Sequence, residues 1–564
     1  MAHDLVIRGG FIVDGTGAPG RTGDLAVSGG RIAEVGEVTG RGAREVDAGG
    51  LVVAPGFIDP HTHYDAQLTW DPAASCSSWH GVTTIVTGNC GFTVAPCRPE
   101  DRLTLMKMLE YVEGMSLEAM QKGIRWEFET FREYLDALDR LPLWVNVAPL
   151  IGHSAVRQFV MGEAAWAREA SAEELERMVA EVKRAMADGA VGFSSTTNMN
   201  HVGDRGRPVP SRLGTDHELE YLAAAMGSTG RGIVELTIGG SRPNRVAEVD
   251  RYVELAKAAG RPVTMVSVRH NPVRPDEHRL ILAKVEAAWR EGLRLHPQGT
   301  CSPLTSTFTI TNGFVFGRYK AWRRVLEAPT SEWRAILADP VFRAEFRDNV
   351  GRTALFGGDV VPLRVKRVIK PELQGFTGKS VVEMARETGK DVIDAFLDLA
   401  LADDFRTEFM SATMNTDAQS VAEIFMHPTA VLGLSDAGAH ITQFSEAGQT
   451  SQLLGHWVRE RRALSLESAV RLITSAPAEI FGIPDRGRLA PGLAGDITIF
   501  DPDAIACHEE EIVNDMLRRA RQRHPVVVRQ RSARHPRRTT PRAPRGLGRR
   551  ARDPGRVRRF IRAS

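Results

Sequence analysis

The stretch GFIDPHTHYDAQ at residues 56–67 decides the fold, because it joins a short apolar run to a pair of histidines. In an extended segment residues two apart face the same side, so His61 and His63 are both expected to point inward from the end of a strand. Neutral imidazole is a good ligand for zinc and similar metals. Surface or capping histidines can produce the same pair, and its position at a strand end is what favours metal binding.

Apolar strand-like segments and helical stretches alternate along the centre of the chain. The eight candidate strands are residues 56–63, 82–91, 143–153, 189–196, 232–237, 262–268, 292–298 and 430–438. Residues 171–189 predict a helix, because Ser171 and Glu174 form a capping box at its start. Eight strands separated by helices favour an α/β fold of the (β/α)8 barrel type over an open sheet.

Both ends of the chain contribute hairpin-like sequence to a second, smaller domain. Residues 1–55 and 485–515 alternate Val, Ile and Leu between Gly and Asp turns, which predicts short strands. Because the termini of a domain often lie close together, we expect one β-sandwich-like domain built from both ends. Residues 56–484 then form the barrel, with long connections near 97–142 and 300–425 that are candidate lids or substrate-binding insertions.

Two further side chains that bind metals end strand candidates. Cys90 lies in VTGNCG at the end of the second strand, and Asp436 lies in LGLSDAGAH at the end of the last. A thiolate binds a borderline-soft metal strongly and can bridge two ions, although a buried structural cysteine is the commoner case. A carboxylate can bind metal and take a proton from activated water, although Ser435 or Asp436 could instead cap a helix.

Taken in order, GFIDPHTHYDAQ, GVTTIVTGNCG, LIGHSAVR, GAVGFSST and SDAGAH resemble the D-aminoacylase branch of the amidohydrolase superfamily. The resemblance covers nearly the whole chain except the tail, and the combination is far more specific than any one motif. It implies a metal-bearing barrel that hydrolyses the amide bonds of N-acyl D-amino acids or similar molecules. It also implies that His61, His63, Cys90 and Asp436 surround the metal, with Asp436 as the acid and base.

The chain departs from this family at two metal-binding histidines. The family places one in a Thr-His-x-Arg motif after the fifth strand and one in a Ser-His motif after the sixth, where this sequence has Ile238 and Val268. His270 lies two residues beyond Val268, and the strand period of two could return it to the correct face. One metal position is therefore expected to be degraded, and the sequence predicts one zinc or other divalent ion per chain.

Three further histidines are candidates for contact with substrate or with the metal ligands. His153 ends the third candidate strand and could equally cap the loop that follows it. His440 lies four residues after Asp436, and His270 follows the sixth strand as described above.

These residues predict a metal-dependent hydrolase in which Asp436 transfers the proton between activated water and the leaving amine. A cyclic amide or a lactone is an alternative substrate, because the same residues would open a ring. A barrel that binds a small molecule without turnover is a second alternative, because two ligand positions are lost. Residues 296–314 carry many hydroxyl groups and are expected to take part in substrate selection.

Composition restricts the function further. Of 564 residues, 42% are hydrophobic and 25% are charged, as in ordinary globular proteins. The start lacks the pattern of a secretory signal, no apolar run reaches the roughly 20 residues of a membrane span, and five cysteines make a disulfide framework unexpected. We therefore expect a cytoplasmic enzyme for a small-molecule substrate, acting without a membrane, with a homo-oligomer left open.

An arginine-rich tail offsets an acidic body. Residues 516–564 contain eighteen Arg, one Asp and neither Lys nor Glu, which is +17 and leaves −15 of the net +2 for residues 1–515. Such a body has no electrostatic reason to bind nucleic acid, whereas a basic arm could bind nucleic acid or an anionic surface. We prefer the hypothesis of a shifted reading frame near Met516, and we predict disorder or poor packing from about Arg518 onward, with an unpaired sheet edge.

Overall fold

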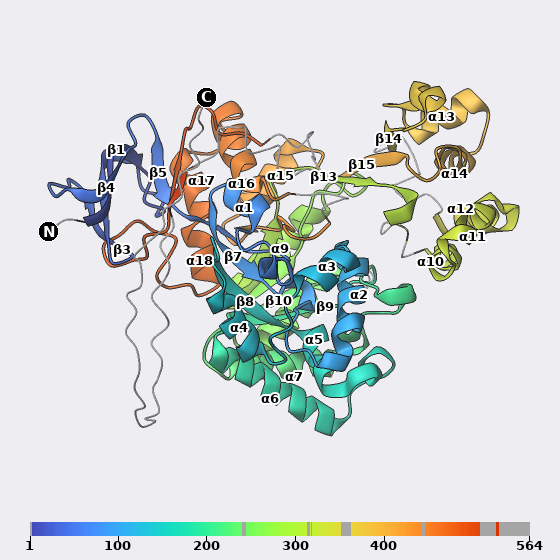
Figure 1. Ribbon diagram of the computed structural model, residues 1–564, viewed down its shortest axis with the longest axis horizontal. Coiled ribbons are helices and arrows are strands. Elements are labelled where there is room, and N and C mark those ends of the chain that lie inside the picture. Colours follow the sequence, from blue (N-terminus) through green and yellow to red (C-terminus); the bar gives the residue numbers. More distant parts are fainter. Residues whose placement is uncertain are drawn as a thin grey trace.

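The centre of the chain folds into a barrel of parallel strands in the computed structural model (Figure 1). The structure describes residues 3–239, 244–312, 316, 319–350, 363–440, 446–507 and 526–528. The barrel strands are β6 (Phe57–Asp59), β7 (Val82–Thr87), β8 (Asn146–Gly152), β9 (Gly192–Thr196), β10 (Ile233–Thr237), β11 (Val263–Val266), β12 (Leu295–Gly299) and β16 (Val431–Leu432). Each overlaps one of the predicted segments. A parallel bridge between Thr62 and Ala437 joins the ends of the first and last strands, so the predicted (β/α)8 barrel is confirmed.

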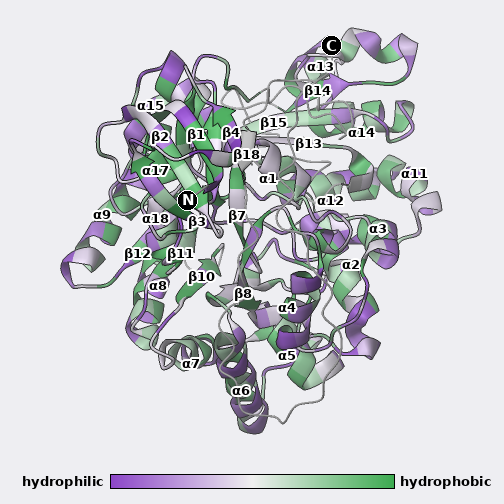
Figure 2. Cartoon of the chain, turned by 60° about the vertical axis from the view of Figure 1, so that its left-hand side comes forward, coloured by the Kyte–Doolittle hydropathy of each residue, from purple (hydrophilic) through white to green (hydrophobic). Residues whose placement is uncertain are grey.

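Helices connect the barrel strands and cover the outside of the barrel (Figure 1). They include α1 (Ser75–Trp79), α5 (His153–Met161), α6 (Ala172–Asp188), α7 (Asp216–Gly227), α8 (Arg245–Ala259), α9 (Glu277–Arg290), α15 (Ala418–Phe425), α16 (Gln449–Gln452), α17 (Leu466–Leu472) and α18 (Ser475–Ile480). The predicted capping box of α6 is present, with Ser171 and Glu174 each accepting from the other's backbone N–H. Figure 2 shows the polar residues of α6, whose other face is buried against the barrel.

A seven-stranded sheet stands beside the barrel and draws its strands from both ends of the chain. Its strands are β1 (His3–Ile12), β2 (Arg21–Ser28), β3 (Arg31–Gly36), β4 (Gly42–Asp47), β5 (Val52–Pro55), β17 (Ile497–Phe500) and β18 (Val526–Val528). β17 pairs antiparallel with β5, which joins the two ends of the chain by backbone hydrogen bonds. Hydrogen bonding makes one sheet that branches at β1, where β2, β4 and β5 all pair.

The arginine-rich tail contributes one strand to this sheet. Val526–Val528 form β18, which pairs antiparallel with β17 from Ile497 to Ile499. The edge of β17, which was expected to be unpaired, is therefore paired by these three residues. Consecutive valines favour the extended backbone that this pairing needs. The rest of the predicted disorder and the proposed frameshift point near Met516 lie outside the described residues.

Two insertions interrupt the barrel. The first carries α2 (Arg102–Glu113), α3 (Leu117–Gly123) and α4 (Phe131–Arg140) between β7 and β8. The second forms a lobe with its own apolar core, which lies to the right in Figure 1. It contains β13 (Leu304–Phe308), β14 (Arg364–Arg367), β15 (Glu408–Met414), α10 (Arg323–Glu327), α11 (Thr330–Ala338), α12 (Pro340–Val350), α13 (Val381–Thr388) and α14 (Val392–Ala402). Among the described helices, none has the length and apolarity that crossing a membrane would require.

Candidate metal centre

Two histidines and a cysteine meet at the carboxyl ends of the barrel strands. His61 and His63 follow β6, and Cys90 follows β7. One potential ligand atom from each lies within 4.8 Å of the others, and all three side chains are buried. Imidazole nitrogen and cysteine sulfur are the ligand types that zinc prefers. The residues that the sequence predicts as ligands are therefore gathered at one point.

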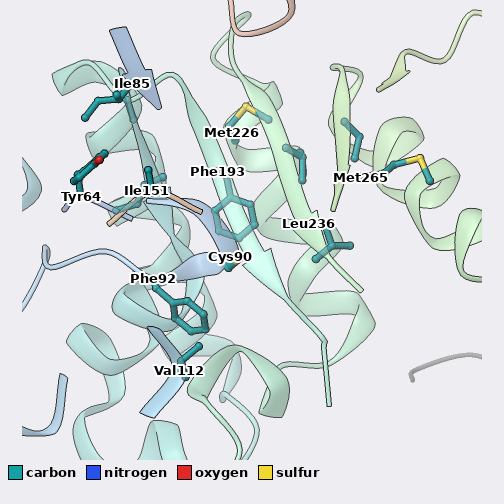
Figure 3. Packing of buried hydrophobic residues seen from close by; sticks show 14 of the residues in the cluster. Tyr64, Ile85, Cys90, Phe92, Val112, Ile151, Phe193, Met226, Leu236 and Met265 are labelled. Carbon is teal, nitrogen blue, oxygen red and sulfur yellow. The ribbon is translucent and has the colours of Figure 1, made fainter. Parts of the chain in front are cut away.

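The backbone around Cys90 is shaped to turn its side chain toward the histidines. Cys90 has φ +56°, in the left-handed region that non-glycine residues rarely adopt. Gly88 before it has φ +78°, and a Cβ there would lie 2.5 Å from the carbonyl oxygen of Leu150. The flanking glycine is thus required by close packing. Figure 3 shows Cys90 between the rings of Phe92 and Phe193.

Side chains of β10 hold Cys90 in this conformation. The Cys90 N–H donates to Glu235 Oε2 at 2.7 Å, and Cys90 Sγ lies 3.0 Å from Thr237 Oγ1. Burial raises the pKa of the Cys90 thiol, and the Glu235 carboxylate raises it further. A bound cation would offset both effects, because it stabilises the thiolate.

Asp436 lies against both histidines, after β16. Its Oδ1 is 3.3 Å from His61 Nε2 and 3.5 Å from His63 Nε2. Burial opposes its ionisation, but the hydrogen bond from His63 and the charge of that ring outweigh burial and hold the pKa of Asp436 well below its ordinary value. The structure thus brings the predicted acid and base to the predicted ligands, as an ionised carboxylate.

Hydrogen bonds on the far sides of the rings fix how the histidines face the site. On the far side of its ring, His61 Nδ1 lies 3.0 Å from Gln298 Oε1. On the side of the site, His61 Nε2 lies 3.6 Å from Cys90 Sγ. Burial lowers the pKa of His61 to about 3, so this imidazole is neutral and can act as a ligand. For His63, the Glu113 and Asp436 carboxylates outweigh burial and raise the pKa to about 9, so a cation would have to displace a proton from this ring to bind it. A partner on one ring nitrogen directs the other toward a metal.

Buried carboxyl groups surround the centre. Burial raises the pKa of Asp59 to about 7, of Asp65 to about 6, of Glu113 to about 7, of Glu235 to about 8 and of Glu446 to about 7. Arg269 Nη1 compensates one of them, at 3.3 Å from Glu446 Oε1. Buried charges are normally paired or coordinate metals. The imidazole, thiol and Asp436 carboxylate groups gathered here fit a divalent cation, which would also favour the ionised forms of the buried carboxyl groups around it.

Sequence reasoning missed several of these neighbours. Glu235 carries a detectable signal, because a carboxylate inside the apolar run GIVELT has to be explained. Gln298 and Glu113 carry no local signal, since only the fold brings them to the histidines. His201 lies in the loop after β9, against the ring of Phe92 at 5.3 Å, and burial lowers its pKa to about 3 with help from His440 and His63.

The three other predicted histidines have different surroundings. His440 is a neighbour of the cluster, with Nε2 3.6 Å from Glu113 Oε2. His270 lies away from the cluster: its N–H donates to Asn415 Oδ1 at 2.8 Å, and its ring packs against His278 at 6.0 Å. The chain turns after β11 and does not continue as a strand, so the period of two does not return His270 to the ligands.

His153 belongs to a buried ion pair. Its Nδ1 lies 2.8 Å from Ser195 Oγ and its Nε2 lies 2.8 Å from Glu218 Oε1. Arg157, which is fully buried on α5, donates to both carboxylate oxygens of Glu218. Ser195 and Glu218 lie outside the metal cluster, and the network packs α5 and α7 against β9. We therefore assign His153 a role in the fold, and its contact with substrate stays a prediction.

We expect Glu218→Gln to destabilise the fold by about 3–5 kcal/mol, because it leaves the buried Arg157 charge without its partner. Burial opposes ionisation of Glu218, but His153 and Arg157 outweigh it and lower the pKa to about 2 from 4.5. The ion pair thus stabilises the protein above pH 4.5, and this contribution is lost as the pH falls toward 2. Urea unfolding between pH 7 and pH 3 measures it. Equal stability of the variant and the wild type would contradict the assignment.

The structure also identifies which residue of β10 faces Cys90. Thr237 does so, and because side chains alternate along an extended chain, we expect Ile238, the first residue after β10, to face the other way. Val268 lines a small cavity with Tyr252 on the helical side of β11. We therefore expect Thr237→His to add a metal ligand and to raise metal content above that of the wild type. Ile238→His is the matched control and is expected to leave metal content unchanged; the opposite ranking in elemental analysis would refute this register.

Fold and site together define a class of enzyme. A barrel that gathers imidazole, thiol and carboxylate groups at its strand ends is built for metal-dependent hydrolysis. The model of the amidohydrolase family matches residues 44–528. The chain belongs to the amidohydrolase family, which confirms the resemblance seen in its motifs.

Individual relatives agree with this assignment along most of the chain. The D-aminoacylase of Alcaligenes xylosoxydans xylosoxydans is 29% identical over 511 residues, which cover 89% of each protein. The crystal structure of N-acyl-D-glutamate deacylase from Bordetella bronchiseptica, in complex with zinc and a phosphonate mimic of the tetrahedral intermediate, matches with a TM-score of 0.65 and 26% identity. That match covers 94% of this chain and 95% of the other. A structure of D-aminoacylase matches with a TM-score of 0.64 and 25% identity, and the match covers 93% of this chain and 95% of the other. That enzyme has a binuclear metal centre in which one metal activates and the second attenuates.

Proposed function

We propose that this enzyme hydrolyses the amide bond of N-acyl D-amino acids with one zinc ion held by His61, His63 and Cys90. The observation that carries the proposal is the position of Asp436, whose Oδ1 lies within 3.5 Å of both histidines. The names of the relatives support the substrate class, since they act as D-aminoacylase and N-acyl-D-glutamate deacylase. Five cysteines without disulfides support a cytoplasmic location.

The chemistry divides between the cation and the chain. A bound zinc ion would supply the positive charge that lowers the pKa of water toward neutrality and polarises the substrate carbonyl. Asp436 is kept ionised by its neighbours, so it can accept the proton of the attacking water. It then returns that proton to the amine nitrogen as the C–N bond breaks, which leaves a carboxylic acid and a D-amino acid.

One ion per chain is favoured over two. The two positions that were expected to supply further imidazoles carry no histidine. Thr237 lies beside Cys90 at the end of β10, and Val268 lies on the helical side of β11. A hydroxyl group is a weaker zinc ligand than imidazole, so the position between Cys90 and β10 is poorly equipped for a second ion.

Metal content and turnover together test the proposal. We expect the purified protein to carry about one zinc per chain and to release free amine from N-acetyl-D-leucine, N-acetyl-D-glutamate or N-acetyl-D-aspartate. The L-enantiomers serve as the matched control and are expected to react far more slowly. Faster turnover of a hydantoin or a lactone would transfer the activity to ring opening. Protein without stoichiometric metal and without turnover would be a binding barrel rather than an enzyme.

A further inference from the structure

We propose that Glu113 is a positioning residue that holds His63 and His440 in place at the metal centre. The proposal rests on the proposed function, because it assumes that His63 binds a metal. Glu113 is the last residue of α2, in the insertion between β7 and β8, and only 2% of its surface is exposed. It lies far in sequence from both histidines, so no motif connects them.

Each oxygen of the Glu113 carboxylate faces a different histidine. Oε1 lies 3.4 Å from His63 Nδ1, and Oε2 lies 3.6 Å from His440 Nε2. The Glu113 carbonyl oxygen also accepts the His440 N–H at 2.5 Å. One residue therefore joins the first insertion to the β6 end and to the loop after β16, through both its side chain and its backbone.

The helix end is built to place this residue. Gly114 terminates α2 with φ +64°, a left-handed conformation that glycine adopts without strain. The helix ends at Glu113, and the carboxylate of this last residue faces the histidines. α2 is anchored by buried apolar residues on the same helix, including Leu105, Leu109 and Val112.

The carboxylate has a chemical consequence for His63. A carboxylate at Nδ1 keeps a proton on that nitrogen, so a cation that displaces the proton of Nε2, on the side of Asp436, would meet a correctly directed lone pair. The acceptor also fixes the rotation of the ring about its Cβ–Cγ bond. Carboxylate partners of this kind increase the basicity of a histidine ligand, and their loss typically weakens metal binding by 10–100-fold.

The side chain of Glu113 is too fully engaged to serve as the proton carrier. Both its oxygens face imidazole nitrogens, whereas Asp436 uses Oδ1 for both of its histidine contacts.

Metal affinity, measured without substrate, tests the inference. Glu113→Gln keeps the shape, but its amide offers one acceptor where the carboxylate offers two. We expect zinc affinity, measured by competition with a chromophoric chelator, to fall by about 10–100-fold. The visible absorption of the cobalt-substituted protein is expected to shift, because His63 is no longer fixed. Glu110→Gln, one turn earlier on α2, is the matched control and is expected to behave like the wild type.

A double-mutant cycle separates positioning from general support of the fold. Glu113→Gln and His440→Gln are expected to cost less affinity together than the sum of their separate losses, because they remove the same contact. The backbone bond between residues 113 and 440 survives in every variant, so any loss belongs to the carboxylate. If the wild type binds metal and the Glu113→Gln variant keeps the same zinc affinity and cobalt spectrum, the role of Glu113 is overturned and the proposed function still stands. A wild type that binds no metal would overturn the proposed function as well.

Discussion

Replacing His61 and His63 together with alanine is expected to remove bound metal and hydrolysis completely while the barrel still folds. The Nε2 atoms of both histidines face Asp436 Oδ1, and that of His61 also faces Cys90 Sγ. Without the two imidazoles, Cys90 and Asp436 alone would hold a cation far less strongly. Elemental analysis and the rate of amine release measure the two losses, and circular dichroism checks the fold.

A control for the double variant should also remove a buried histidine. His296 on β12 is suitable, because its Nδ1 lies 2.9 Å from the carbonyl oxygen of Thr429 and its ring packs against Trp289 on the helical side of the barrel. His296→Asn is expected to keep both metal and activity. Stoichiometric metal in the protein that lacks His61 and His63 would mean that the ligands lie elsewhere.

The barrel could be predicted from sequence because its signals are local and repeated. Each strand is a short apolar run, and α6 begins at a capping box that one can read in four residues. The ligands could be predicted for the same reason, since His61, His63, Cys90 and Asp436 each end such a run. Local pattern and global fold agree at these positions.

The partners of the ligands could not be predicted, because tertiary structure alone brings them together. Gln298 on β12 meets His61 and Glu113 at the end of α2 meets His63, with no spacing in the sequence that connects them. The sequence also could not distinguish the two possible environments of His153, which lies at a strand end but faces the Arg157–Glu218 pair. A histidine at a strand end is therefore a candidate whose partners decide its role.

Asp436→Asn is expected to lower the rate of hydrolysis by about 10²–10⁴-fold, the usual range for a general acid or base. The substitution removes the proton acceptor and little else. Asp436 has φ +48°, and asparagine tolerates this left-handed conformation as readily as aspartate, so the backbone after β16 is expected to hold. The loss should appear in kcat more than in KM, because the proton transfer belongs to the transition state.

The comparison that decides the role of Asp436 is between metal content and rate. With His61, His63 and Cys90 intact, the Asp436→Asn variant is expected to retain most of its zinc, so a large loss of rate identifies a proton carrier rather than an essential ligand. Asp417→Asn is the matched control: Asp417 caps α15 by accepting the Ser420 N–H at 2.8 Å, and asparagine caps equally well. Hydrolysis at the wild-type rate by the Asp436→Asn variant would move the acid and base to another carboxylate, for which Glu235 is the first candidate because it contacts Cys90.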